Sequence, residues 1–283
     1  MKGKVVLITG ATNGIGLEAA RAIAKKGARV VIVGRNPQKT REVAAQLTQE
    51  SGAEVSAILG DLSLMRDVRK VADEFRQKFD RLDVLLNNAG AVFNTYQRTE
   101  EGNEMTFALN HLNYFLLTHL LLDMLKASAP ARIINVSSNA HRVGPLDVDN
   151  LQSEKGFSAF GAYGRSKLEN IMFTYELARR LEGTDVTVNA LHPGFVRTGF
   201  GHNMSGIFSN IARLAQIFAI TLEQGAETSI YLATSPEVEG VSGRYFVKSK
   251  AVRSSNASYD ETAWRRLWEA SEKLTGIGNA AHA

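Results

Sequence analysis

The fold is decided by one stretch near the amino terminus, Val5-Val6-Leu7-Ile8-Thr9-Gly10-Ala11-Thr12-Asn13-Gly14-Ile15-Gly16. Its first four residues are apolar and mostly β-branched, which is typical of a strand buried on both faces. A helical pattern follows and ends at Gly27. Glycines at a strand-to-helix turn let backbone N–H groups approach a pyrophosphate at the positive end of the helix. The stretch predicts a dinucleotide site, although its spacing is G-x-x-x-G-x-G and not G-x-G-x-x-G. An ordinary strand-to-helix turn is the alternative.

The second predicted strand, Arg29 to Arg35, ends without a carboxylate. Sites that prefer NAD place Asp or Glu near this point to bind the ribose 2′-hydroxyl, whereas an arginine accommodates the 2′-phosphate of NADP. Arg35 stands here, and the first carboxylate beyond it is Glu42. The pattern favours NADP, with a solvated arginine at a helix start as the alternative.

Strands and helices alternate along the rest of the chain. The further strands are predicted at Val55 to Leu59, Val84 to Leu86, Ala131 to Ser138, Val186 to Leu191 and Tyr245 to Val247. The helices between and after them are predicted at Pro37 to Glu50, Ser63 to Phe79, Met105 to Met124, Tyr163 to Leu181, Ile207 to Phe218, Leu222 to Ala233 and Ser258 to Thr275. This order predicts one α/β domain over residues 1–283, a doubly wound parallel sheet with helices on both faces.

Some segments carry more specific expectations. We expect Asp61 or Ser63 to cap the helix that runs to Phe79, and Ser258-x-x-Glu261 to form a capping box. Residues 199–222 contain a helical apolar face, interpreted as a lid over an apolar substrate; a core helix and a membrane-surface helix are the alternatives. Residues 277–283 are predicted to be a frayed tail.

Composition excludes several classes of protein. The 44% hydrophobic and 22% charged fractions are those of a soluble globular protein, and the net charge of +4 is not gathered into a basic run, so no nucleic-acid partner is expected. With no cysteine there is no disulfide or thiolate metal site, and the scattered histidines predict no metal. No signal peptide, and no apolar segment long enough to span a membrane, is expected. Cytoplasmic localisation is the resulting prediction.

Tyr163 and Lys167 lie four residues apart in Gly161-Ala162-Tyr163-Gly164-Arg165-Ser166-Lys167. Positions i and i+4 share one face of a helix, so the phenol and the ammonium can point into the same volume. A nearby cation lowers the pKa of a phenol from its ordinary value of about 10. Reaching 7 would take about 4 kcal/mol, more than one lysine is expected to supply. The alternative is a core aromatic beside a surface lysine.

The chain resembles the short-chain dehydrogenase/reductase family over essentially its whole length. The matching motifs are Thr9-Gly10-x-x-x-Gly14-Ile15-Gly16, Asn87-Asn88-Ala89-Gly90, Asn110, Ser138, Tyr163-x-x-x-Lys167 and Pro193-Gly194-x-x-x-Thr198. Within the family it is most similar to the retinol dehydrogenase branch, through Asn110-His111-Leu112, Arg132 to Ser138, Leu191 to Gly194 and Ser242 to Phe246. The resemblance implies a Rossmann-type fold.

The resemblance also implies the roles of individual residues. Tyr163 would exchange a proton with the substrate oxygen, Ser138 would hydrogen-bond that oxygen, and Lys167 would lower the pKa of Tyr163 and hold the nicotinamide ribose. Asn110 would position a water molecule that links the lysine to solvent. The implied cofactor-binding residues are Gly10, Thr12, Asn13, Gly14, Ile15, Gly16, Arg35, Asp61, Leu62, Asn88, Ala89, Gly90, Tyr163, Lys167, Pro193, Gly194, Val196 and Thr198.

Two departures from the family pattern, and one ambiguity, remain. The segment between Ser138 and Tyr163 is longer than usual, and no membrane anchor is expected because Val5 already begins the first strand. Strand geometry alone does not separate Ser137 from Ser138; the resemblance selects Ser138.

The expected function is an NADP-dependent oxidoreductase acting on a lipophilic alcohol, aldehyde or ketone. The alternatives are a light-dependent protochlorophyllide reductase-like enzyme and a non-catalytic NADP-sensing protein. The substrate, the direction of reaction and homo-oligomer formation stay open. Apolar residues expected near the substrate are Phe93, Phe195, Phe200, Ile207, Phe208 and Phe218.

Overall fold

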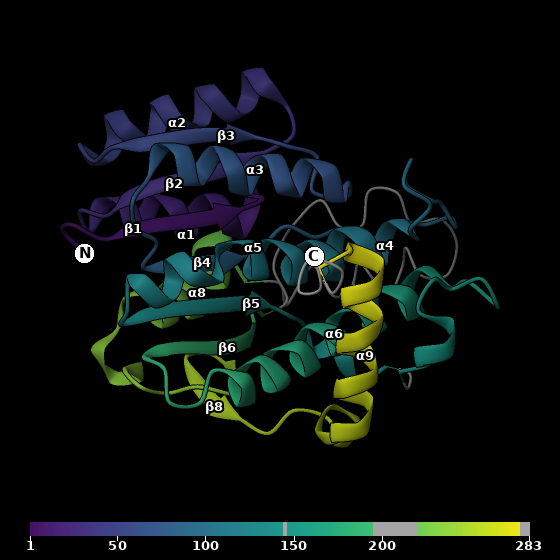
Figure 1. Cartoon of the computed structure of the whole chain (residues 1–283). Coiled ribbons are helices and arrows are strands. Elements are labelled where there is room, and N and C mark those ends of the chain that lie inside the picture. The colour runs from purple at the N-terminus through teal and green to yellow at the C-terminus, as the bar shows by residue number, and fades with distance from the viewer. Residues whose placement is uncertain (144–145, 195–219, 278–283) are drawn as a thin grey trace.

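A single eight-stranded sheet forms the centre of the protein, in the order β3-β2-β1-β4-β5-β6-β7-β8 (Figure 1). The computed structural model describes residues 1–143, 146–194 and 220–277. The strands are β1 (Val5–Thr9), β2 (Arg29–Gly34), β3 (Val55–Leu59), β4 (Val84–Asn87), β5 (Ala131–Val136), β6 (Val186–His192), β7 (Arg244–Val247) and β8 (Lys250–Val252). Strands β1 to β7 run parallel, and β8 pairs antiparallel with β7. The predicted doubly wound parallel sheet is confirmed; the sequence did not predict β8.

The strand order reverses beside β1. From β1 the chain moves outward to β2 and β3, then crosses back to place β4 on the other side of β1. The pairing of Val6 with Val84 and of Ile8 with Leu86 sets the carboxyl ends of β1 and β4 next to each other. In open parallel sheets the crevice at such a reversal is where ligands bind. The topology therefore predicts a ligand site after Thr9 and Asn87.

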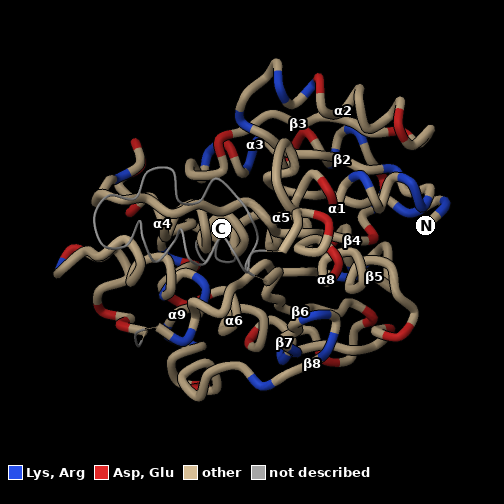
Figure 2. Tube along the Cα trace, turned by 180° about the vertical axis from the view of Figure 1, so that it is seen from behind, with Lys and Arg blue, Asp and Glu red and all other residues tan. Residues whose placement is uncertain are grey.

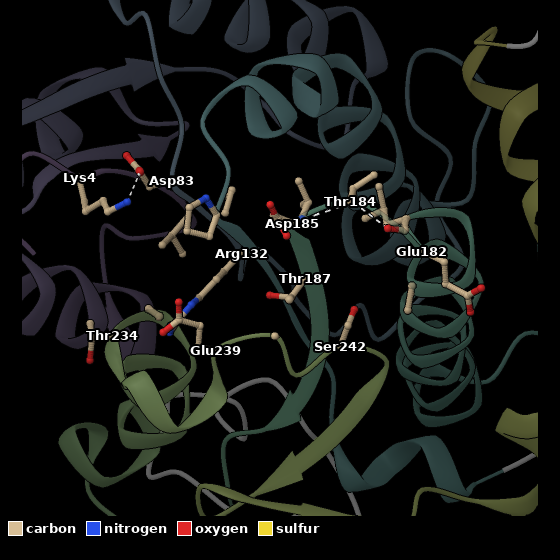
Figure 3. Close-up of a pocket in the computed structure, with 18 of the residues that line it drawn as sticks. Lys4, Asp83, Arg132, Glu182, Thr184, Asp185, Thr187, Thr234, Glu239 and Ser242 are labelled. Atoms are coloured by element: carbon tan, nitrogen blue, oxygen red, sulfur yellow. Dashed lines mark hydrogen bonds and ion pairs between the residues drawn. The ribbon is translucent and has the colours of Figure 1, made fainter.

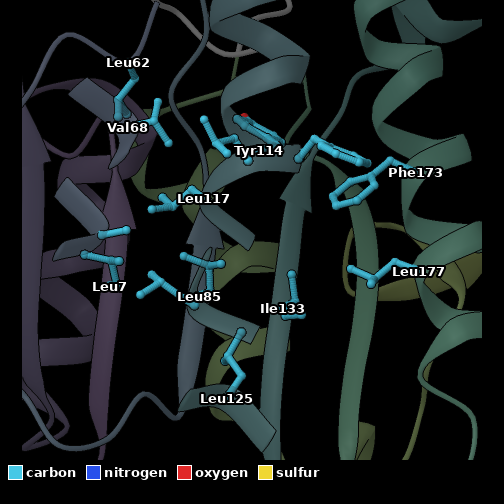
Figure 4. Packing of buried hydrophobic residues seen from close by; sticks show 14 of the residues in the cluster. Leu7, Leu62, Val68, Leu85, Tyr114, Leu117, Leu125, Ile133, Phe173 and Leu177 are labelled. Carbon is cyan, nitrogen blue, oxygen red and sulfur yellow. The ribbon is translucent and has the colours of Figure 1, made fainter. Parts of the chain in front are cut away.

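Helices cover both faces because successive strand residues point to opposite sides. Leu7 and its neighbours pack against α3 (Met65–Lys78), α5 (Asn113–Ala127) and α6 (Ala159–Arg180). Ile8 and its neighbours pack against α1 (Gly14–Lys25), α2 (Pro37–Ser51) and α8 (Leu222–Thr234). Figure 4 shows the first of these layers, where Leu85 and Ile133 of the sheet lie beneath α5 and α6. Helix α9 (Glu261–Thr275) lies on the outside of α6.

The helix predicted from Met105 to Met124 is not uniform. It consists of a short turn α4 (Met105–Phe107), a π-helical segment (Ala108–Leu112) and then α5. Asn110 lies within the wider π turn. Segments of this kind are frequent at functional sites.

Two predicted helix caps are wrong. The first backbone N–H groups of α3 donate to the carboxylate of Glu101, from Met65 at 2.6 Å and from Arg66 at 3.0 Å. Asp61 instead accepts from the backbone and hydroxyl of Ser63. Helix α9 is capped by Asp260, whose Oδ1 accepts from the second and third helical N–H groups at 3.0 Å. Each cap is a carboxylate at a positive helix end, supplied by a residue other than the one predicted.

Other predicted segments fall largely outside the described residues. Of the proposed lid at residues 199–222, only 220–222 are described, and Thr221 caps α8. Of residues 277–283, Ile277 is described and packs against the core. Within the described ranges no helix has the length and apolar character to cross a bilayer. Acidic and basic residues are interspersed over the helices (Figure 2).

Candidate active site

The glycine turn after β1 is packed so closely at Gly10 and Gly16 that neither position has room for a side chain. A Cβ atom on Gly16 would lie 2.4 Å from Asn88 Nδ2 and 2.6 Å from the carbonyl oxygen of Gly10. Asn88 stabilises the turn, because its Nδ2 donates to the carbonyl oxygens of Thr9 at 2.9 Å and Gly10 at 3.1 Å. Asn13 is the N-cap of α1, and its side chain makes no capping bond to the helix. Backbone N–H groups of the first turn of α1 are thus available to an anion such as a pyrophosphate.

Tyr163 and Lys167 lie on α6, whose first turns press against the segment after β5. A Cβ atom on Gly164 would lie 2.8 Å from the carbonyl oxygen of Ala140, so only glycine lets the helix approach this closely. Lys167 is 3% exposed, and its Nζ lies 5.5 Å from the ring centroid of Tyr163. The same Nζ donates to the carbonyl of Val136 at 3.2 Å. The predicted pair therefore lies close together at the end of β5, with the lysine buried and the phenol half-buried.

The two serines after β5 have different surroundings. Ser137 is 1% exposed, and its hydroxyl donates to the carbonyl oxygen of Lys167 at 2.7 Å. Ser138 is half-buried and makes a side-chain hydrogen bond with Tyr163. The hydroxyl of Ser137 is thus used in packing α6 onto the sheet, whereas that of Ser138 stands beside the phenol.

Asn110 is brought to the same place by the π-helical segment. Its Oδ1 accepts from the backbone N–H of Ala91 at 2.9 Å, and its Nδ2 donates to Ser166 Oγ at 3.0 Å. A Cβ atom on Gly90 would lie 3.1 Å from Asn110 Oδ1 and 3.3 Å from Lys167 Nζ. Asn110, Ser138, Tyr163 and Lys167, predicted from separate parts of the sequence, therefore meet at the carboxyl edge of the sheet near the glycine turn.

This arrangement matches that of a known family. The family model described as short chain dehydrogenase matches residues 4–206, a range that contains the glycine turn and all four of these polar residues. The chain belongs to the short-chain dehydrogenases.

This short-chain dehydrogenase belongs to the retinol dehydrogenase branch of the family. It is 46% identical to retinol dehydrogenase 14 of Mus musculus, over 98% of this chain and 87% of that protein. It is 42% identical to retinol dehydrogenase 12 of Homo sapiens, over 98% of this chain and 88% of that protein.

Solved structures share the fold of this short-chain dehydrogenase. An uncharacterized protein from Mycobacterium paratuberculosis is 31% identical with a TM-score of 0.79, over 97% of this chain and 94% of that one. The Pseudomonas aeruginosa RhlG/NADP active-site complex is 28% identical with a TM-score of 0.71, over 87% of this chain and 94% of that one.

The end of β2 holds the residues expected to select the cofactor. In this short-chain dehydrogenase the Arg35 side chain is 78% exposed and pairs with Asp61, Nη1 to Oδ2 at 3.3 Å. Burial raises the pKa of Asp61, but hydrogen bonds from Ser63 and Arg35 outweigh it and lower the pKa overall. A Cβ atom on Gly34 would lie 2.5 Å from Thr12, so the glycine turn and this cation are neighbours. The side chain of Leu62 packs into the core, so its role in binding a cofactor stays a prediction.

The remaining predicted cofactor residues follow β6. Gly194 has φ +97°, and a Cβ atom there would lie 2.4 Å from Ile220 Cδ1, so the position requires glycine. Pro193 directly precedes it at the end of β6. Val196 and Thr198 lie outside the described residues.

Loss of water is the main influence on the ionisation of Tyr163 and Lys167, contrary to the sequence-based expectation that Lys167 lowers the pKa of Tyr163. Burial raises the pKa of Tyr163 to about 12, and the hydrogen bond with Ser138 offsets only part of this effect. Burial also lowers the pKa of Lys167 to about 7. In both groups loss of water disfavours the charged form. A lysine that is itself only partly charged near neutral pH is a weak source of phenolate stabilisation.

One residue without a predicted role joins this cluster. Asn170 Nδ2 donates to the carbonyl oxygen of Asn110 at 2.9 Å. Because Asn170 follows Lys167 by three positions, both lie on one face of α6, and helical spacing could have identified it.

A hollow of about 520 Å³ lies at the opposite edge of the sheet, by the amino ends of β4, β5 and β6 (Figure 3). Two of the cations that line it are bonded within the protein: Lys4 pairs with Asp83 at 2.8 Å, and Arg132 donates to the carbonyls of Leu232 and Ser235. It is separate from the site of this short-chain dehydrogenase.

Proposed function

We propose that this short-chain dehydrogenase is an NADP-dependent oxidoreductase that transfers a hydride between nicotinamide and a lipophilic alcohol, aldehyde or ketone. The observation that carries the proposal is the convergence of Asn110, Ser138, Tyr163 and Lys167 beside a glycine turn that excludes side chains. The packed turn fits a dinucleotide, with Gly10, Gly14 and Gly16 close to its phosphates. A bound nicotinamide supplies the hydride.

Each of the four residues has a role in moving the proton that accompanies the hydride. Tyr163 gives its proton to the carbonyl oxygen of the substrate in reduction, or takes it from the alcohol in oxidation. Ser138 hydrogen-bonds that oxygen and stabilises its developing charge. Lys167, with a pKa of about 7, can take up and release a proton near neutral pH and so restore the one that Tyr163 gives. Asn110 positions the water that connects the lysine to solvent.

The two directions of reaction need different protonation states of Tyr163. With a pKa of about 12, the phenol is protonated near neutral pH, which is the form that donates to a carbonyl oxygen. Oxidation of an alcohol would first require loss of that proton, and a positively charged nicotinamide ring nearby would assist it.

Preference for NADP is supported at the end of β2. Arg35 offers a guanidinium for the 2′-phosphate, and the structural relative from Pseudomonas aeruginosa is described as an NADP complex. In this chain the pairing of Arg35 with Asp61 keeps the guanidinium near the turn without burying it. The cytoplasmic location predicted from the sequence stays a prediction.

A lipophilic substrate is supported by the names of the relatives, because retinol is a largely apolar alcohol. Phe93 is half-buried, and the other apolar residues expected near the substrate lie outside the described residues. A non-catalytic NADP sensor would gain nothing from an assembled set of proton-transfer groups. A protochlorophyllide reductase-like enzyme is less favoured because such enzymes depend on cysteines, and this chain has none.

The proposal is tested by NADPH absorbance with a panel of retinal, aliphatic aldehydes and steroid ketones, using wild type, Tyr163→Phe and Tyr175→Phe. Tyr175 lies further along α6 and hydrogen-bonds Ser254, so it is a matched phenol outside the site. Tyr163→Phe is expected to lower kcat by at least about 100-fold with NADPH affinity nearly unchanged, and the Tyr175 variant to stay within about threefold of wild type. Retention of a tenth of wild-type kcat in Tyr163→Phe removes Tyr163 from this role.

A further inference from the structure

His111 follows Asn110 in the π-helical segment and is completely buried. Its ring stacks on Phe107 with centroids 5.4 Å apart. Both ring nitrogens nevertheless meet polar side chains: Nδ1 lies 3.3 Å from Asn170 Oδ1, and Nε2 lies 3.0 Å from Ser271 Oγ. Because Ser271 belongs to α9, this ring joins the last described helix of the chain to the segment that carries Asn110.

The orientation of Asn170 follows from its other contacts. Its Nδ2 lies 2.9 Å from the carbonyl oxygen of Asn110 and 3.3 Å from that of Val136. A carbonyl oxygen only accepts, so the amide nitrogen must occupy this position and Oδ1 must face His111. Since Oδ1 also accepts only, the ring must carry a proton on Nδ1.

The hydrogen bond with Ser271 determines whether Nε2 of His111 carries a proton. Its hydroxyl has one proton and two acceptors within reach, His111 Nε2 at 3.0 Å and the carbonyl of Leu267 at 2.8 Å. If the proton went to Leu267, Nε2 would need a proton of its own and the ring would be an imidazolium. Burial lowers the pKa of His111 to about 4, so the ring is neutral near pH 7. Ser271 therefore donates to Nε2.

We propose that His111 is a positioning residue, the middle of a directed series of hydrogen bonds that runs from Ser271 through His111 and Asn170 to the carbonyl oxygen of Asn110. Every donor in the series points toward the site, and the series is complete only with the Nδ1–H tautomer. This inference rests on the proposed function, because Asn110 takes part in a reaction only if that function is correct.

Lys167 shares an acceptor with this series. Its Nζ and Asn170 Nδ2 both donate to the carbonyl oxygen of Val136, at 3.2 Å and 3.3 Å. Asn170 can hold both carbonyls only while His111 fixes its Oδ1. Without the ring nitrogens the amide can rotate, and the carbonyl oxygens of Asn110 and Val136 lose their common donor. Packing of α9 through Ser271 thereby controls how firmly the site is held.

The tautomer is measured by NMR of the protein labelled with 15N-histidine, with His111 assigned from the signal that His111→Phe lacks. Phenylalanine keeps the stacking on Phe107 and removes both nitrogens. Wild type is expected to show His111 protonated at Nδ1, unprotonated at Nε2 and unchanged from pH 6 to 8. If His111→Phe does not fold, Ser271→Ala gives the assignment by shifting the Nε2 signal. Protonation at Nε2, or titration of His111 in this range, overturns the proposal.

Kinetics test whether the series acts on the site. Ser271→Ala removes the hydroxyl that begins it, and Ser229→Ala is the control: an equally buried serine on α8 whose hydroxyl has no partner among the described residues. Ser271→Ala is expected to lower kcat about tenfold with KM for NADPH within about twofold, and Ser271→Thr to restore most of it. Equal kcat in the two alanine variants overturns the positioning role.

Different measurements contradict the proposed function and the role of His111. Retained turnover in Tyr163→Phe overturns the proposed function and with it the role given to His111. An Nε2–H signal in a protein whose Tyr163→Phe variant is inactive overturns the role of His111 alone, because the NMR measurement needs no turnover.

Discussion

The hydroxyl of Ser137 donates a 2.7 Å hydrogen bond to the main-chain carbonyl of Lys167. This bond turns Ser137 toward the helix and leaves Ser138, one residue later, beside the phenol of Tyr163. The two neighbouring hydroxyls at the end of this strand therefore have different roles. That of Ser137 packs the helix onto the sheet, and that of Ser138 lies in the site.

Alanine at each serine separates these tasks. Ser138→Ala is expected to lower kcat about 100-fold, as loss of one donor to a developing oxyanion does. Its free energy of unfolding is expected to fall by no more than about 1 kcal/mol, because the hydroxyl also accepts from the backbone N–H of Ala140 at 3.2 Å. Ser137→Ala is expected to keep kcat within about threefold and to lower the free energy of unfolding by about 1 kcal/mol, because only a packing hydrogen bond is lost. Steady-state kinetics and urea denaturation of both variants check this. A large loss of kcat in Ser137→Ala, with kcat nearly unchanged in Ser138→Ala, would place Ser137 in the site.

Arg35→Asp tests which group selects the cofactor. Aspartate repels a 2′-phosphate and accepts from a ribose 2′-hydroxyl, so the ratio of kcat/KM for NADPH to that for NADH is expected to fall at least about tenfold. Arg41→Asp on α2 is the control for a change of two charges, and its ratio is expected to stay within about twofold of wild type. An unchanged ratio in Arg35→Asp means that the 2′-phosphate is held elsewhere.

Glu169 makes stability depend on pH. It is 1% exposed, and neither carboxyl oxygen has a hydrogen-bond partner among the described residues. Burial raises its pKa from 4.5 to about 8, with Arg165 opposing and Glu104 adding to the shift. The folded protein therefore holds a proton that the unfolded chain releases above pH 4.5. Stability falls as pH rises from about 4.5 to 8, by at most ~1.4 kcal/mol per pH unit.

Glu169→Gln keeps the shape and removes the titration, so its free energy of unfolding should fall less than that of wild type between pH 6 and 8. Glu176→Gln is the control on the same helix. Glu176 is also buried, which raises its pKa, but bonds from Arg179 and Arg180 lower the pKa overall, so its effect is constant over this range. Parallel profiles for wild type and Glu169→Gln would show that Glu169 is ionised when folded.

Gly16→Ala tests the packing of the turn. The added Cβ would meet Asn88 Nδ2 at 2.4 Å and a backbone oxygen at 2.6 Å, so the turn must shift. We expect a loss of about 1–3 kcal/mol of stability and weaker NADPH binding by fluorescence titration. Gly161→Ala on α6 meets ordinary contacts of 3.5 Å and should change stability by no more than about 1 kcal/mol, with NADPH affinity unchanged. Equal NADPH affinity in both variants contradicts the role of the turn.

The sequence alone determined the features that depend on neighbours along the chain. Alternating strand and helix patterns predicted the parallel sheet, because side-chain periodicity reports which face of an element is buried. Tyr163 and Lys167 were predicted together since helical geometry sets residues four apart on one face. The glycine turn was also predicted, because its glycines and the strand and helix around them are neighbours in the sequence.

Only the tertiary structure decided the features that depend on contacts across the chain. Glu101 caps α3 from a distant loop, and His111 meets Ser271 of α9, pairings that no local pattern specifies. The pKa of Tyr163 is raised, against expectation, because burial outweighs the hydrogen bond with Ser138. The extent of burial is known only once the elements pack. Local geometry can say which groups face the same way; the loss of water around them is a property of the folded molecule.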